Sequence, residues 1–355
     1  MNRLMLAAFV IFLLSVPAIF VSGIAEVRRR EDTVPAPIIA HRIRDRMEQR
    51  RLERVPQLGT ATRLPGGGAG YESVLIHGQV RTFMRYTPNK VLVAGKKAPV
   101  VFALHGARGT ADRLQPYLGL NAVADRDGFI VVYPQGLDKT WNDGRPPELR
   151  GGRADTEADD VAFLNSLADA LVAQGAADPA RMFISGVSNG GFMALKMACE
   201  ASSRFAAVGA VIASVPVDAK GTCKPGRAVP VVMINGTDDP VIRYDGGAGR
   251  AGVKGNLAVP DAARLFAELD GCGAVTDVPA DKRDPSDATS VSQRVWTGCK
   301  DGSSVALYTV NGGGHQPPAM GAVSGGPVLG FVLGTRSHQI DTAETMWSFF
   351  KGYGQ

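Results

Sequence analysis

Short apolar runs alternate with helical patterns along the chain from Tyr71 almost to its last residue. The runs at 73–76 and 80–86 flank His77 and Gly78 in the way that the strands of a hairpin flank their turn. Such alternation predicts an α/β domain with a mainly parallel sheet, helices on both faces and this hairpin at one edge. Further strands are expected at 100–104, 129–133, 182–185, 208–213, 231–234 and 305–310, and helices at 120–126, 160–171, 190–199, 259–269 and 342–350.

The N-terminal residues 4–24 are almost wholly apolar and follow a single basic residue, Arg3. A cleaved secretory signal has this layout, and Ser22 to Ala25 offer small residues for a cleavage site. An uncleaved membrane anchor of about 20 residues fits as well, and the basic run Arg28 to Arg30 counts against efficient cleavage. We therefore expect an exported protein in which residues 1–25 are a signal peptide or an anchor, with residues 4–24 as a possible membrane tether.

Residues 26–70 are interpreted as a linker between that segment and the catalytic domain, residues 71–355. The segment contains Pro35 and Pro37, a basic stretch at 41–54 and a glycine-rich end at 66–70. A short surface helix on an anionic membrane is an alternative for the basic stretch. A solvated tether is the simpler interpretation, and the sequence does not explain why this tether is so basic.

The composition, 45% hydrophobic and 21% charged residues in 355, is that of an ordinary globular protein. The net charge of +5 comes mostly from the N-terminal part, where residues 26–58 hold nine arginines against six acidic residues. The remainder of the chain is close to neutral. It therefore lacks the basic face that a nucleic-acid-binding protein needs.

Four cysteines, Cys199, Cys223, Cys272 and Cys299, lie in the second half of the chain. Their spacing does not suggest a zinc site, because none of them forms a C-x-x-C pair. An even number in an exported chain suggests two disulfides. Three pairings are possible, and we favour the two between sequence neighbours, Cys199–Cys223 and Cys272–Cys299; buried free thiols are the alternative.

The sequence Gly186-Val187-Ser188-Asn189-Gly190 lies between an expected strand and an expected helix. A serine hydroxyl must be presented to a base and to substrate, and a sharp strand-to-helix turn does this. The flanking glycines suit a turn where strand and helix pass close together. The sequence therefore predicts that Ser188 is a nucleophile, whereas a plain glycine-rich turn is the structural alternative.

The base must be a histidine that follows the nucleophile in the chain, since the order is Ser, then Asp or Glu, then His. His315 comes directly after the expected strand 305–310, at the carboxyl end where such sheets place their chemistry. His338 lies in a polar loop and is interpreted as an ordinary surface histidine. Asp238 and Asp239 both follow the strand 231–234, and the pattern alone does not choose between them as the acid.

An oxyanion hole needs backbone N–H groups aimed at the developing negative charge. One donor should be the N–H of Asn189, directly after the nucleophile, and the second should come from the loop after an earlier strand. The loop at His105, Gly106 and Ala107 follows the strand 100–104, so the N–H of Ala107 is the candidate. His105 itself has the character of a structural, hydrogen-bonded histidine.

These features together resemble a family of exported α/β-hydrolase esterases, the polyhydroxybutyrate depolymerases and feruloyl esterases. The similarity runs from about Gly70 to Tyr353. The matching segments are 104–106, 132–134, 140–144, 159–161, the Ser188 turn, 236–240, 312–315 and 340–350.

The resemblance implies Asp239 as the acid, because the family's G-T-x-D-P pattern leaves Asp238 at the variable position. It supports the two cysteine pairings named above. It also places Trp141 near the active site, so that Trp141 and His105 become candidate substrate contacts; a core aromatic is an equally good interpretation of Trp141. The chain departs from the family after His315, where Gln-Pro-Pro stands in place of a tryptophan and proline, and residues 319–332 could flank the acyl pocket.

The sequence thus predicts a serine esterase of the α/β-hydrolase fold that acts on short hydroxyalkanoate or hydroxycinnamate esters without a metal or an organic cofactor. Because there is no separate domain for docking on an insoluble polymer, a small or oligomeric ester is the expected substrate. A peptidase or acyltransferase on the same fold is one alternative. A catalytically silent, envelope-tethered binding protein is another.

Overall fold

The computed structural model describes residues 58–62, 70–94, 96–149, 158–247, 255–279, 282–320 and 332–354. The expected signal peptide or anchor at residues 1–25 lies outside these ranges, as does most of the expected linker. Among the helices in the described ranges, none combines the length and apolar character that a membrane span requires.

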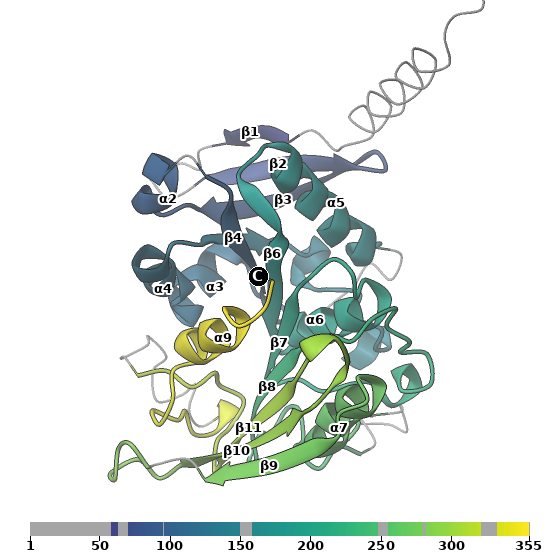
Figure 1. Cartoon of the computed structure of the whole chain (residues 1–355), viewed down its shortest axis with the longest axis vertical. Helices are drawn as coiled ribbons and strands as arrows, with labels where there is room; N and C mark the ends of the chain where they lie inside the picture. The colour runs from purple at the N-terminus through teal and green to yellow at the C-terminus, as the bar shows by residue number, and fades with distance from the viewer. Residues whose placement is uncertain are drawn as a thin grey trace, which may run out of the picture. The chain divides into compact units, whose positions relative to one another are not determined.

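A single mixed sheet of eleven strands organises the described residues, in the order β1-β2-β3-β5-β4-β6-β7-β8-β11-β10-β9 (Figure 1). The neighbours from β5 to β11 pair in parallel, and antiparallel strands extend the sheet at both ends. This is the α/β-hydrolase fold that the resemblance implies. The strands are β1 (Leu58–Thr62), β2 (Tyr71–Ile76), β3 (Gln79–Tyr86), β4 (Ala98–Leu104), β5 (Ile130–Pro134), β6 (Ala177–Val187), β7 (Ala207–Val211), β8 (Val231–Gly236), β9 (Ala274–Pro279), β10 (Ser290–Thr297) and β11 (Val305–Asn311).

The central strands are apolar throughout because both of their faces are covered. In β4 every residue is buried. Its side chains alternate between two hydrophobic cores, with Phe102 and Leu104 in one and Val101 and Ala103 in the other. A strand with two buried faces therefore reads as a continuous apolar run, as it does in this sequence.

Helices cover the two faces in two separate groups (Figure 1). One group packs in the core that contains Phe163, Phe192 and Phe266, and the other in the core that contains Leu114 and Trp347. The first group is α5 (Asp160–Ala173), α6 (Asn189–Glu200) and α7 (Val259–Leu269); the second is α3 (Ala111–Leu118), α4 (Leu120–Asp127) and α9 (Thr342–Phe350); the short α2 (Asn89–Ala94) follows β3.

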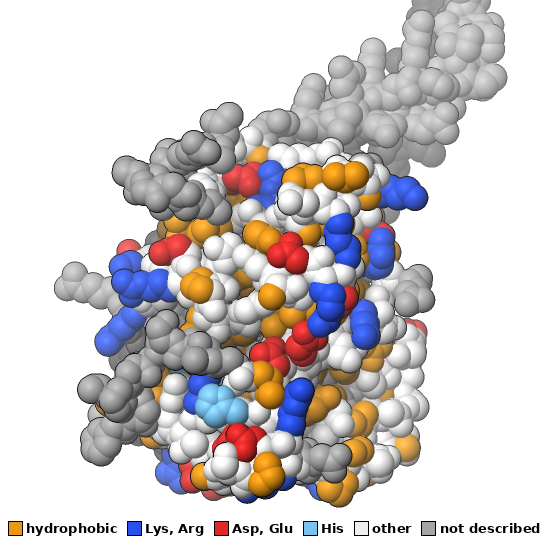
Figure 2. Space-filling view, turned by 90° about the vertical axis from the view of Figure 1, so that its left-hand side faces the viewer, with side chains coloured by type: hydrophobic (Ala, Val, Ile, Leu, Met, Phe, Trp, Pro, Cys, Tyr) orange, Lys and Arg blue, Asp and Glu red, His pale blue; other side chains and the backbone are white. Residues whose placement is uncertain are grey.

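Charges of both signs intermix on the face of the molecule that Figure 2 shows. On this side α4 and α9 are joined by the guanidinium of Arg126, which pairs with Glu344 at 2.6 Å and with Asp127 at 2.8 Å. These pairs are exposed, so they contribute little to stability.

All the strands and helices that the sequence predicts are present, with shifts at their ends. The structure adds elements that the pattern did not indicate, above all the antiparallel pair β9 and β10 at the far edge. All six residues of β9 are exposed, so this strand carries no apolar run or one-sided alternation. At the other edge β1 lies within residues 26–70, so the sheet begins inside the segment interpreted as a linker.

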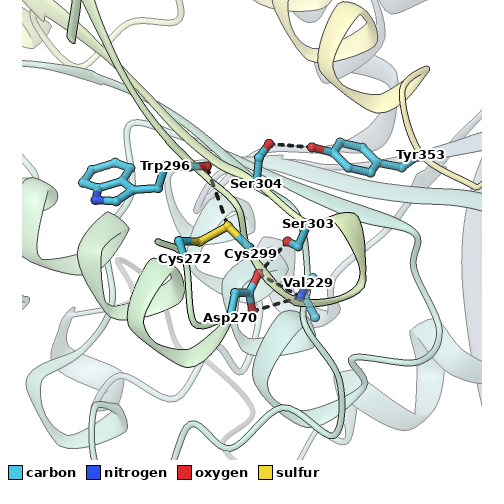
Figure 3. Close-up of a disulfide and its surroundings, with 8 residues drawn as sticks. All are labelled: Val229, Asp270, Cys272, Trp296, Cys299, Ser303, Ser304 and Tyr353. Carbon is cyan, nitrogen blue, oxygen red and sulfur yellow. Dashed lines mark hydrogen bonds between the residues drawn. A yellow bond between two sulfur atoms is a disulfide. The ribbon is translucent and has the colours of Figure 1, made fainter. Parts of the chain in front are cut away.

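The structure contains both favoured disulfides. Cys199–Cys223 joins the last turn of α6 to the segment that follows β7, and Cys272–Cys299 joins the end of α7 to the end of β10 (Figure 3). Beside the second disulfide, the buried carboxylate of Asp270 accepts hydrogen bonds from the Val229 N–H and from the Ser303 hydroxyl. The second disulfide thus closes the base of the hairpin formed by β9 and β10, and Asp270 fixes the neighbouring segments beside it.

Replacing Cys272 and Cys299 together by alanine should lower the free energy of unfolding by about 3 kcal/mol. The bond closes a loop across a sequence separation of 27, and opening a loop of that size enlarges the conformational freedom of the unfolded chain. Denaturant titration of the wild type and the double variant under non-reducing conditions measures the difference. Equal unfolding midpoints would show that this cross-link does not stabilise the domain.

Candidate active site

Ser188 occupies the sharp turn between β6 and α6. Its backbone has φ +53° and ψ −120°, a conformation that side-chain-bearing residues rarely adopt. The Ser188 N–H donates to the carbonyl of Val211 on the neighbouring strand at 2.9 Å. The turn therefore presents the hydroxyl beyond the edge of the sheet, where a strained conformation is held by the surrounding backbone.

Glycines surround Ser188 because backbone segments pass too close for any side chain. A Cβ on Gly186 would lie 2.2 Å from the carbonyl carbon of Gly190. A Cβ on Gly190 would lie 2.3 Å from the carbonyl oxygen of Leu104, and one on Gly191 would lie 2.7 Å from the Cβ of Ala213. The three glycines are thus required by contacts between β6, β4 and the segment after β7, which the motif alone did not show.

His315 and Asp239 complete a chain of hydrogen bonds with Ser188. The His315 Nε2 lies 3.0 Å from the Ser188 Oγ, and its Nδ1 lies 2.7 Å from the Asp239 Oδ2. The side chain of His315 is 10% exposed and that of Asp239 is 1% exposed. The imidazole is therefore held from one side by a buried carboxylate, while its other nitrogen meets the serine hydroxyl.

The two aspartates after β8 have different surroundings. Asp239 is buried, and its Oδ1 accepts the N–H groups of Val241 at 2.8 Å and Ile242 at 2.7 Å, which fixes the carboxylate. Asp238 is exposed and accepts from the neighbouring Thr237 hydroxyl at 2.8 Å. Only Asp239 contacts His315, in line with the position that the resemblance implies.

The loop at residues 105–107, which the sequence predicts to carry an oxyanion donor and which is here called the oxyanion loop, lies against the Ser188 turn. A Cβ on Gly106 would be 3.5 Å from the Cβ of Ser188. The next residues are held by the Arg108 N–H, which donates to the Lys139 carbonyl at 2.8 Å. This closeness leaves Ala107 and Asn189 as the predicted backbone donors on either side of the nucleophile.

The His105 side chain is buried, with 1% of it exposed, which fits a structural histidine better than a substrate contact; the expected contact stays a prediction. Its Nε2 accepts the N–H of Gly136 at 3.0 Å, and its Nδ1 lies 2.8 Å from the Gly106 carbonyl. Burial lowers the pKa of His105 to about 4. The neutral ring therefore links the oxyanion loop to the segment after β5.

Trp141 is likewise fully buried, as the core interpretation expects. Its indole N–H donates to the His105 carbonyl at 2.8 Å, and its backbone N–H donates to the Asn189 Oδ1 at 2.8 Å. Trp141 thus connects the His105 carbonyl to the Asn189 side chain beside the Ser188 turn.

The side chain of Asn189 has a structural task that the sequence reasoning missed. It is fully buried, and its Nδ2 donates to the Asp143 carboxylate at 2.5 Å. Asp143 in turn pairs with Arg145 at 2.6 Å, and that guanidinium lies 3.8 Å from the centre of the Phe192 ring. The sequence offered one signal for this role. Asp143 lies in segment 140–144, which matches the family although no catalytic role is expected for its carboxylate.

A second buried ion pair supports the same segment. Arg81 on β3 bonds the carboxylate of Asp160 at 2.6 Å, and the other oxygen of Asp160 accepts the Asn142 N–H at 2.7 Å. Burial raises the pKa of Asp160. The loop after β5 is therefore fixed at both Trp141 and Asn142 by side chains from other elements.

A cavity of about 250 Å³ lies beside α6, one helical turn beyond Ser188. The helix supplies Phe192, Leu195 and Lys196 to its wall, and the Cys199–Cys223 disulfide borders it. Further lining residues are Asp143, Gly144, Val215, Pro216, Asp218 and Ala219. Residues Phe192 and Val215 are almost fully buried, so much of this wall is apolar and preformed.

Within the described ranges, no group of three or more histidine, cysteine, aspartate or glutamate side chains is placed to hold a metal ion.

Comparison with known proteins finds a matching family model and related sequences whose names describe esterases. The family model described as Esterase PHB depolymerase matches residues 82–281. A protein of Nocardia uniformis subsp. tsuyamanensis whose name describes it as an esterase, NocK, is 28% identical over 79% of this chain and 81% of its own length. Feruloyl esterase C of Emericella nidulans is 28% identical over 63% of this chain and 73% of its own length.

Other similarities cover less of the molecules compared. Feruloyl esterase B of Piromyces equi is 29% identical over 62% of this chain, which spans only 40% of that relative. Among solved structures, an acetyl xylan esterase from Aspergillus awamori superimposes with a TM-score of 0.45 at 17% identity, covering 66% of this chain and 89% of that one.

Substituting His105 by glutamine should remove a pH dependence of stability. The folded-state pKa of about 4 is below the ordinary value of 6.5, so the unfolded chain binds the proton more readily between these values. The stability that neutral His105 contributes is therefore complete above pH 6.5 and decreases by about 3 kcal/mol as the pH falls to 4. Urea unfolding at pH 7 and pH 4 should show the wild type losing this amount relative to the variant. Identical losses in both proteins would contradict the prediction.

Proposed function

This chain belongs to the Esterase PHB depolymerase family, and from that membership we propose a serine esterase in which Ser188, His315 and Asp239 form the catalytic triad. The coarser statement, that it is a carboxylic ester hydrolase, follows from the family and from its feruloyl esterase relatives. The observation that carries the finer proposal is the pair of hydrogen bonds that links the Ser188 Oγ to His315 and His315 to Asp239.

In the first half of the proposed reaction, the His315 Nε2 accepts the Ser188 hydroxyl proton while the Oγ attacks the ester carbonyl carbon. Asp239 accepts a hydrogen bond from the His315 Nδ1–H, which orients the imidazole, and its negative charge stabilises the imidazolium that forms. The imidazolium then gives its Nε2 proton to the oxygen of the leaving alcohol as the carbon–oxygen bond breaks. The products of this half are the free alcohol and an acyl group on Ser188.

In the second half, water replaces the alcohol. His315 accepts a proton from the water, whose oxygen attacks the acyl carbon, and then returns the proton to the Ser188 Oγ as the acid leaves. Both tetrahedral intermediates carry a negative oxygen. We propose that the N–H groups of Asn189 and Ala107 bind it, aided by the positive end of α6, which begins at Asn189.

The proposed substrates are short hydroxyalkanoate or hydroxycinnamate esters. The proposal places the acyl group in the cavity beside α6, whose lining includes Phe192, four residues after Ser188 in the chain. The two disulfides are typical of exported proteins, so the proposed ester is one met outside the cytoplasm.

A serine-directed fluorophosphonate should label the wild type at Ser188 and leave Ser188→Ala unlabelled. Asp239→Asn should slow both labelling and ester turnover by about a thousandfold or more, because His315 loses the carboxylate that orients it. The matched control is Asp238→Asn, which removes an exposed carboxylate one residue away and should be nearly neutral. Peptide mass spectrometry and stopped-flow labelling give the two measurements. The enzyme proposal fails if folded wild type is not labelled, and the acid moves to Asp238 if the two variants exchange behaviour.

Filling the cavity beside α6 should change which acyl groups the enzyme accepts without impairing the catalytic steps themselves. Ala219→Trp, at the partly exposed rim of the cavity, should lower kcat/KM about tenfold for hydroxycinnamate and hydroxybutyrate-oligomer esters and leave acetyl esters almost unchanged. Val217→Trp is the control, since Val217 is exposed and does not line the cavity. Kinetics on a panel of these esters measures the effect. Equal losses for large and small acyl groups would remove the cavity from the substrate site.

A further inference from the structure

Residues 333–339, here called the bridging segment, run beside the turn that carries His315. The His315 N–H donates to the Leu333 carbonyl at 2.5 Å, and the Gly314 N–H donates to the Thr335 carbonyl at 2.7 Å. The fit is close, because a Cβ on Gly314 would lie 2.2 Å from the Leu333 carbonyl oxygen. The backbone position of His315 therefore depends on where the bridging segment lies.

The other end of the bridging segment is bound to the tip of the β9–β10 hairpin. The carboxylate of Asp287 accepts the His338 N–H at 2.6 Å through Oδ2. The hydroxyls of Thr289 and Ser337 hydrogen-bond to each other, with their oxygens 2.7 Å apart. The amide of Gln339 adds bonds from its Nε2 to the carbonyls of Asp284 at 2.8 Å and Thr289 at 3.1 Å.

These contacts are buried although the hairpin itself is largely exposed. Thr289 and Ser337 are each 1% exposed, Gln339 is 2% exposed and Asp287 is 9% exposed. The Asp287 Oδ1 also accepts both the N–H and the hydroxyl of Thr289, at 2.8 and 2.9 Å. The carboxylate of Asp287 thus binds Thr289 in the hairpin tip through one oxygen and His338 in the bridging segment through the other. Its loss would leave buried donors without an acceptor.

The β9–β10 hairpin that binds the bridging segment is itself held by a disulfide and by strand pairing. The Cys272–Cys299 disulfide closes it at its base (Figure 3), and β10 pairs with β11 from Ser290↔Asn311 to Trp296↔Val305. Strand β11 leads directly into the His315 turn. The hairpin therefore meets that turn by two routes, through β11 and through the bridging segment.

We propose that Asp287 is a positioning residue for His315, acting through the bridging segment rather than through contact with substrate. The inference rests on the proposed function, in which His315 is the base. By holding the His338 N–H and Thr289, Asp287 fixes the segment whose carbonyls set the His315 backbone. A shift of the imidazole by a fraction of an ångström relative to Ser188 then slows proton transfer without changing how the ester binds.

The test compares Asp287→Asn with the wild type. The amide has the shape of the carboxylate but must turn a donor toward either His338 or Thr289. We expect kcat to fall about ten- to a hundredfold with KM within about twofold of the wild type, and fluorophosphonate labelling of Ser188 to slow by the same factor as kcat. Asp277→Asn on the same hairpin is the control: it removes an exposed pair with Arg294 and should leave kcat unchanged.

A merely structural role for Asp287 predicts a different result. The midpoint of unfolding would fall, while the folded fraction at low temperature would keep the wild-type kcat and labelling rate, and this outcome would overturn the proposal. Thr289→Val removes the second bond to the bridging segment and gives the same comparison if Asp287→Asn does not fold. Failure of the proposed function is recognised separately, because the wild type itself would then escape labelling at Ser188.

Discussion

The close approach of backbones at the Ser188 turn is the constraint on which the rest of the site depends. Ser188 holds a positive φ because β4, β6 and the segment after β7 pass within contact distance of each other there. That approach is possible only where Gly186, Gly190 and Gly191 lack side chains. The energy stored in the strained turn is balanced by the burial of the central strands, which fixes the elements that hold it.

Buried polar side chains fix the loops at the carboxyl ends of the strands, and these loops hold the candidate catalytic residues in place. The Asn189 side chain holds the loop after β5, neutral His105 holds that loop to the oxyanion loop, and Asp239 holds His315. Each of these groups is almost completely shielded from water, so leaving any one of them without its partner costs more than an exposed hydrogen bond would. The geometry of the site therefore depends on the buried side chains of Asn189 and His105 as well as on the hydrogen-bonded set of Ser188, His315 and Asp239.

The two edges of the sheet differ in how near they lie to the candidate site in the strand order. The N-terminal edge, with β1 and β2, is separated from β6 and β8 by other strands, whereas β11, β10 and β9 follow directly on β8, after which Asp239 comes in the chain. The tip of the disulfide-closed hairpin at this edge is bonded to the bridging segment, whose carbonyls accept the backbone N–H groups of Gly314 and His315.

The sequence by itself determined the α/β class, the order of the central elements, the candidate nucleophile and base and, with the family resemblance, the acid and the cysteine pairings. These are local patterns: apolar runs with two buried faces, a glycine-flanked serine and polar residues at strand ends. Only the tertiary structure decided that His105 and Trp141 are buried, that Asn189, Asp143 and Asp160 organise the loops, and that exposed β9 joins the sheet. The reason is physical, because burial and hydrogen-bond partners far apart in the chain exist only once the strands have been brought side by side.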